Sequence, residues 1–90
     1  MELERYFVRN EDNGLIEIWL MPLSFGDGHY TKSIEAVVNE GFSSQGYLKK
    51  EEAEKFKAEV QNHYLRKHDK IPNLSVVKVK INLEIIPEKV

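Results

Sequence analysis

The most constraining feature of this chain is a strict alternation of side chains near its carboxyl end. Between Val76 and Ile86, hydrophobic residues alternate with polar ones, and Pro87 follows directly. Successive side chains of a β-strand point to opposite faces, so this period predicts a strand with one buried face and one hydrated face. The predicted inward residues are Val77, Val79, Ile81, Leu83 and Ile85, and the predicted outward residues are Lys78, Lys80, Asn82 and Glu84. Such a strand is typical of an antiparallel sheet that a helix covers on one side.

Residues 50–68 have the pattern of that covering helix. Apolar residues recur at helical spacing and form one stripe, which consists of Ala53, Phe56, Val60 and Tyr64. Acidic residues lie near the amino end of this segment and basic residues near its carboxyl end, so both signs complement the helix dipole. The stripe is expected to face the inward side of the last strand. The expected contacts of Phe56 and Val60 are Val79, Ile81 and Leu83.

Asn13-Gly14 predicts a hairpin near the amino end of the chain. Asn-Gly readily adopts positive φ at both central positions of a type I′ turn, which joins two antiparallel strands. The flanking segments, at about 4–10 and 15–22, are rich in aromatic and β-branched residues and are predicted strands. A two-residue turn sets Val8 opposite Trp19. The pairs that follow from it are Tyr6 with Met21, Phe7 with Leu20 and Arg9 with Ile18.

This hairpin has two apolar faces. One carries Phe7, Ile16, Ile18 and Leu20, and the other carries Tyr6, Val8, Trp19 and Met21. A single helix covers only one face of a sheet, so the second face is expected to meet another chain, or else residues 23–46 fold back over it. Tyrosine and tryptophan are enriched at interaction hot spots. The residues predicted to bind a partner are therefore Tyr6, Val8, Trp19 and Met21.

The middle of the chain admits two interpretations. Residues 29–40 favour a strand by propensity, whereas Ser33 as a cap and Gly41 as a stop would frame a short helix; the strand is preferred. Gly26-Asp27-Gly28 is predicted to be a tight turn between strands, with an anion-binding loop as the alternative. The predicted fold is a single α+β domain over residues 1–90. Its three or four antiparallel strands and one long helix follow the order β-β-(β)-α-β.

No catalytic constellation is found in the sequence. The chain has no cysteine, no phosphate-binding loop and no Gly-x-Ser-x-Gly motif, so we expect no enzyme activity and no cofactor. Its histidines are His29, His63 and His68. The expectation is that no metal is bound; a zinc site built from His29, one helix histidine and an acid is the alternative. His68 is expected to complement the carboxyl end of the helix.

The net charge of the chain and its lack of targeting patterns bear on the expected function. The net charge is −2, whereas nucleic-acid-binding domains usually carry a positive excess. There is no signal-peptide pattern and no long apolar run, so a cytoplasmic protein without membrane contact is expected. We expect a protein-binding module, an inhibitor or adaptor like many small phage and mobile-element proteins, whose partner is a target protein or a second copy. The alternative is nucleic-acid binding through basic residues, namely Arg66, Lys67, Lys70, Lys78 and Lys80.

Overall fold

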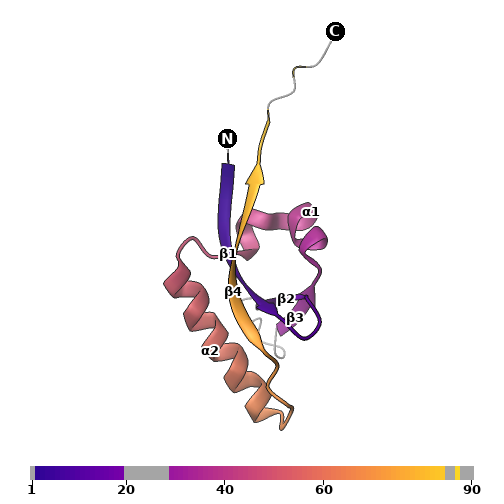
Figure 1. Ribbon diagram of the computed structural model, residues 1–90, viewed down its shortest axis with the longest axis vertical. Coiled ribbons are helices and arrows are strands. Elements are labelled where there is room, and N and C mark those ends of the chain that lie inside the picture. The colour runs from indigo at the N-terminus through magenta and orange to yellow at the C-terminus, as the bar shows by residue number, and fades with distance from the viewer. Residues whose placement is uncertain (1, 20–28, 85–86, 88–90) are drawn as a thin grey trace, which may run out of the picture.

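A computed structural model describes residues 2–19, 29–84 and 87 of the chain. The elements in chain order are β1 (Glu2–Asn10), β2 (Ile16–Trp19), β3 (His29–Lys32), α1 (Ile34–Gln45), α2 (Lys50–Arg66) and β4 (Leu74–Asn82). The four strands form one antiparallel sheet in the order β3-β2-β1-β4 (Figure 1). The predicted α+β class with an amino-terminal hairpin is confirmed. The chain has a second helix that the prediction lacked.

The hairpin turn is longer than predicted. Val8 pairs with Glu17 rather than Trp19, which shifts the register by two residues. The N–H of Asn10 donates to the carbonyl of Leu15 at 2.8 Å, so four residues rather than two form the loop. The side-chain oxygen of Asn10 accepts the N–H of Asp12, an Asx-type bond that stabilises the longer turn. Because the shift is even, each residue keeps its predicted face.

The middle segment contains both of the predicted alternatives in succession. Residues 29–32 form β3, but the preferred strand is wrong beyond Lys32, because α1 begins at Ile34. The Ser33 hydroxyl accepts the N–H of Ala36 at 3.2 Å and caps the helix. Gly41 does not stop the helix: it adopts φ 151° and ψ 51°, which kinks α1 before its end at Gln45. Gly26-Asp27-Gly28 lies outside the described residues.

The two helices cover opposite faces of the sheet. Figure 1 shows α2 on one side of β1 and β4, and α1 on the other. The cluster on the α1 side consists of Phe7, Ile16, Ile18, Val37 and Phe42, with Val77, Val79 and Ile81 packed against it. The cluster on the α2 side consists of Val8, Phe56, Val60 and Leu74, with Tyr47, Tyr64 and Val76 packed against it. Among the described residues of the hairpin, Phe7, Ile16 and Ile18 on one face and Val8 on the other are therefore buried within the chain.

The predicted partners of α2 in the last strand are wrong. Phe56 and Val60 are buried as expected, but they pack against Val8 and Leu74. Of the predicted inward set, Val77, Val79 and Ile81 pack on the α1 side instead, and Leu83 is 40% exposed. Ile85 lies outside the described residues. The prediction placed one helix on the side of the strand with more apolar residues. With a helix on each face, α1 occupies that side and α2 packs where β4 begins.

Strands β1 and β4 form a ribbon that continues beyond the rest of the sheet. They pair over nine residues each, from Glu2 opposite Asn82 to Asn10 opposite Leu74. Over the described residues, strand β2 pairs with β1 at Val8 and Arg9. Figure 1 shows the two strands running side by side past α1 toward the free ends of the chain. This ribbon carries the surface that is described next.

Candidate functional site

The outer side of β4 is an edge of the sheet. Within the described residues, the only strand that pairs with β4 is β1. The N–H groups of Tyr6 and Asn10 point away from β4, because they donate to Tyr47 and Leu15. In an antiparallel ladder, the backbone N–H and C=O groups of successive residues point alternately to the two sides of the strand. The backbone groups of the odd-numbered residues of β1 and β4 therefore point toward each other. The residues of β4 whose backbone N–H and C=O face outward are Leu74, Val76, Lys78, Lys80 and Asn82.

Two lysines and one glutamate lie on the face of the ribbon that belongs to the α2 side. The ammonium groups of Lys78 and Lys80 lie 3.4 and 3.2 Å from the two carboxylate oxygens of Glu4 on β1. Hydrogen bonds from Lys80 and then Lys78 lower the pKa of Glu4, and the bond to Glu4 raises the pKa of Lys78. The Lys78 ammonium also lies 5.7 Å from the centre of the Tyr6 ring. One carboxylate is thus paired with two ammonium groups, so the patch formed by Glu4, Lys78 and Lys80 has a net positive charge.

The four residues predicted to bind a partner have different environments. Tyr6 is half-buried on β1, opposite Lys78. Val8 is 0% exposed beneath α2, so a partner does not reach it in this arrangement. The backbone of Trp19 ends β2 opposite His29, while its side chain and the whole of Met21 lie outside the described residues. Of this set, the structure places Tyr6 next to the ribbon surface.

The five basic residues of the nucleic-acid alternative are not brought together. Arg66, Lys67 and Lys70 are exposed where α2 ends and the chain turns toward β4. Lys78 is separated from Leu74, at the start of β4, by about 13 Å of strand at ~3.3 Å per residue, and Lys80 by about 20 Å. Both of these lysines are paired with Glu4. The set is therefore divided between the segment before β4 and the second half of that strand.

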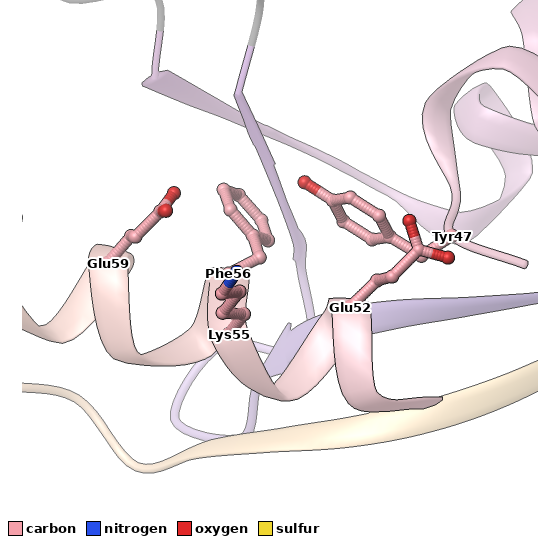
Figure 2. A pocket seen from close by; sticks show the side chains of 5 residues that line it. All are labelled: Tyr47, Glu52, Lys55, Phe56 and Glu59. Carbon is pink, nitrogen blue, oxygen red and sulfur yellow. The ribbon is translucent and has the colours of Figure 1, made fainter. Parts of the chain in front are cut away.

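A hollow lies between α2 and the segment that precedes it (Figure 2). Its volume is about 220 Å³, and it is lined by Tyr47, Glu52, Lys55, Phe56 and Glu59. Figure 2 shows the Phe56 ring and the carboxylates of Glu52 and Glu59 projecting from α2 on the side where the Tyr47 ring lies. Tyr47 is held there by two backbone hydrogen bonds to Tyr6, of 2.8 and 2.9 Å. The hollow therefore lies beside Tyr6, the residue of β1 that is opposite Lys78.

A polar cluster is buried between the carboxyl half of α2 and the sheet. At its centre is Glu17 on β2, whose residue is 2% exposed. The Tyr64 hydroxyl and the Asn10 side-chain amide donate to Glu17 Oε1 at 3.1 and 3.2 Å, and His29 Nε2 hydrogen-bonds Glu17 Oε2. Burial, followed by the charge of Glu17, raises the pKa of Tyr64 to about 12. The carboxylate is therefore compensated by three side chains from β1, β3 and α2, as a buried charge requires.

Two histidines of the zinc alternative meet in this cluster. The rings of His29 and His63 lie with their centres 4.8 Å apart, and the acid in contact with His29 is Glu17. Across the described part of the chain, no three histidine and acidic side chains have an arrangement that could hold a metal ion. His68 lies after α2 with φ 58°, and its N–H donates to the Leu65 carbonyl at 3.0 Å. This contact belongs to the end of the helix, where His68 was expected.

Sequence reasoning did not identify the hydrogen bonds around Glu17. The available signal was a glutamate between Ile16 and Ile18, on a face that otherwise carries Val8 and Trp19. A charge on an apolar face indicates a buried partner, but its identity depends on the packing of α2. The cluster joins α2 to β1, β2 and β3 and lies in the interior, which makes it a stabilising contact. The exposed candidates for function are the β4 edge and the hollow.

Comparison with known proteins supplies no relative. No family model, curated protein or solved structure matches this chain. In the described part of the chain, neither helix is both long enough and apolar enough to cross a membrane.

Proposed function

We propose that this protein is a small protein-binding module that pairs an extended segment of its partner with the outer edge of β4. The observation that carries the proposal is the position of β4 at the end of the strand order, with an outward-facing row of backbone donors and acceptors. An edge of this kind accepts another strand through main-chain hydrogen bonds, while side chains on the two faces select the sequence.

The form of the edge supports this use. Proteins usually blunt an edge strand with a proline, a bulge or a short length, because a long regular edge invites pairing. β4 has nine residues, contains no proline and pairs with β1 in unbroken register. Lysines also protect edges, and Lys78 and Lys80 disfavour pairing with a second copy that sets them opposite each other. The edge is therefore better suited to a different chain than to self-association.

The side chains on the two faces of β4 indicate which segment fits. Lys78 and Lys80 share the single carboxylate of Glu4 on one face, so acidic residues at alternate positions of the partner would add to the patch. Val79 and Ile81 are half-buried on the other face and suit apolar residues at the intervening positions. The favoured partner is thus an extended segment that alternates acidic and apolar residues.

A proline substitution tests the proposal because it removes one outward N–H. Strand edges tolerate proline where the N–H faces solvent, so Lys80→Pro is expected to fold, with circular dichroism as the check. The matched control is Lys80→Ala, which loses the same ion pair but keeps the N–H. Capture of partners from the native host is expected to be lost with Lys80→Pro and retained with Lys80→Ala.

Two results would count against the proposal. Capture that survives in a folded Lys80→Pro variant would show that the backbone edge is not used. Capture that disappears after nuclease treatment of the lysate would favour the nucleic-acid alternative instead.

A further inference from the structure

The hollow beside α2 has the size of a site for one side chain. Its volume is about 220 Å³, whereas pockets for cofactors and drug-sized ligands span roughly 300–1,000 Å³. The hollow is connected to β4 through β1. Tyr47 forms a backbone bridge with Tyr6 on β1, and Tyr6 in turn lies opposite Lys78 on β4. With strands ~4.8 Å apart, the Tyr47 backbone lies about 10 Å from that of β4. One partner is therefore large enough to contact both.

The walls of the hollow are aromatic. The rings of Tyr47 and Phe56 have their centres 5.6 Å apart and are inclined at 42°. Phe56 is buried in the core cluster of α2, which fixes that wall, and the Tyr47 backbone is tied to β1. The face of an aromatic ring attracts a cation within about 6 Å of its centre. Planar guanidinium groups stack on such faces better than ammonium groups do.

The charge of the hollow is negative. Glu52 and Glu59 contribute two carboxylates and Lys55 one ammonium group. One oxygen of Glu52 accepts the N–H of Lys49 at 3.2 Å, whereas Glu59 has no hydrogen-bond or ion-pair partner within the described residues. Burial raises the pKa of Tyr47, and the charges of Glu59 and Glu52 raise it further, so both carboxylates act on the aromatic wall. An incoming cation would meet these charges and the ring together.

We infer that the hollow receives the side chain of an arginine from a protein partner, with its guanidinium stacked on Tyr47 and paired with Glu59. The inference rests on the proposed function, because a protein carries the arginine. It adds a side-chain contact to the backbone contact at β4, and it names the chemistry that the second contact selects.

The test uses capped Gly-Arg-Gly as the probe, titrated into the full chain and followed by amide shifts in NMR spectra. The peptides Gly-Lys-Gly and Gly-citrulline-Gly are the comparison, and citrulline keeps the shape of arginine without its charge. We expect the arginine peptide to shift the amides of Tyr47, Phe56 and Glu59, the lysine peptide to bind more weakly, and the citrulline peptide to leave them unchanged.

Three substitutions on α2 distinguish the charged residues that line the hollow from a nearby carboxylate that does not. Glu59→Gln is expected to weaken binding of the arginine peptide about two- to fivefold, the range of one exposed ion pair. The control Glu54→Gln alters a carboxylate that does not line the hollow and is 4.0 Å from Lys57, and it is expected to leave binding unchanged. Lys55→Gln removes a competing cation and is expected to strengthen binding.

Equal binding of the arginine and citrulline peptides would overturn the inference, as would equal weakening by Glu59→Gln and Glu54→Gln. These results are distinct from failure of the proposed function. Lys80→Pro is expected to abolish partner capture but to leave peptide binding unchanged, because the hollow does not include β4. Partner capture that is weakened by Glu59→Gln but unchanged by Lys80→Ala would show that the captured protein supplies the arginine.

Discussion

The hydroxyl of Tyr64 on α2 donates a hydrogen bond of 3.1 Å to the buried carboxylate of Glu17 on β2. This bond joins residues that are far apart in the sequence and fixes the carboxyl half of α2 against the sheet. The amino half of the helix is fixed by Phe56, which packs beside Tyr47. The two attachments determine where the hollow lies relative to β4.

Tyr64→Phe is expected to destabilise the protein by about 1.5–3 kcal/mol, because it removes a hydrogen bond to a charged, buried acceptor without changing the shape of the side chain. Urea denaturation measures the difference in the free energy of unfolding. A difference near zero would show that Asn10 and His29 alone satisfy Glu17.

The raised pKa of Tyr64 predicts a loss of stability at high pH. Its pKa in the folded protein is about 12, above the ordinary tyrosine value of 10.0, so folding favours the neutral hydroxyl. The corresponding stability is fully present below pH 10 and is lost as the pH rises toward 12. Urea midpoints from pH 9 to pH 11.5 are expected to fall less steeply in Tyr64→Phe than in the original chain. Parallel slopes for the two proteins would contradict this assignment.

Phe56→Ala is expected to cost about 3–5 kcal/mol, which is enough to unfold a domain of this size. Phe56 is 3% exposed and packs in the cluster with Val8 and Leu74. The control on the same helix is Leu65→Ala, since Leu65 is 55% exposed and its truncation is expected to change stability by less than about 0.5 kcal/mol. A similar loss of stability in both variants would contradict the orientation of α2, in which Phe56 faces the sheet and Leu65 faces away from it.

Gly46 permits the close approach of the segment between the helices to β1. A Cβ atom at this position would lie 2.6 Å from the Cβ of Arg5 and 2.7 Å from the Phe7 ring. Gly46→Ala is therefore expected to destabilise the protein by about 1–3 kcal/mol and to displace Tyr47 from the hollow. Thermal unfolding measures the first effect and the amide shift of Tyr47 the second. An unchanged melting temperature would contradict the packing of this segment.

The parts of the fold that could be predicted from the sequence are those determined by residues close together in the chain. The apolar stripe that contains Phe56 and Val60 depends on period alone, and α2 is found where it was expected. The hairpin register depends on the Asn10 side chain, whose bond to the loop backbone is invisible to a rule based on Asn13-Gly14. Ser33 was recognised as a cap, but propensity favoured the competing strand. Local signals compete at such positions, and tertiary packing decides between them.

The candidate site was less accessible to sequence reasoning. The alternation around Lys78 and Lys80 predicted a half-exposed strand, but the edge position of β4 follows from strand order, which no local pattern determines. Tyr47 and Glu59 are brought together by the turn into α2, and neither stands out in the sequence. Val8 was expected at a contact surface because the second helix was not foreseen.

Amide hydrogen exchange along β4 reports directly on whether a partner strand pairs with its outer edge. In the free protein, the N–H groups of Val77 and Val79 face β1 and are expected to exchange slowly, whereas those of Lys78 and Lys80 face outward and are expected to exchange fast. When a captured partner is bound, the amides of Lys78 and Lys80 are expected to become protected to the level of their neighbours. Fast exchange of Lys78 and Lys80 in a saturated complex would contradict pairing at the β4 edge.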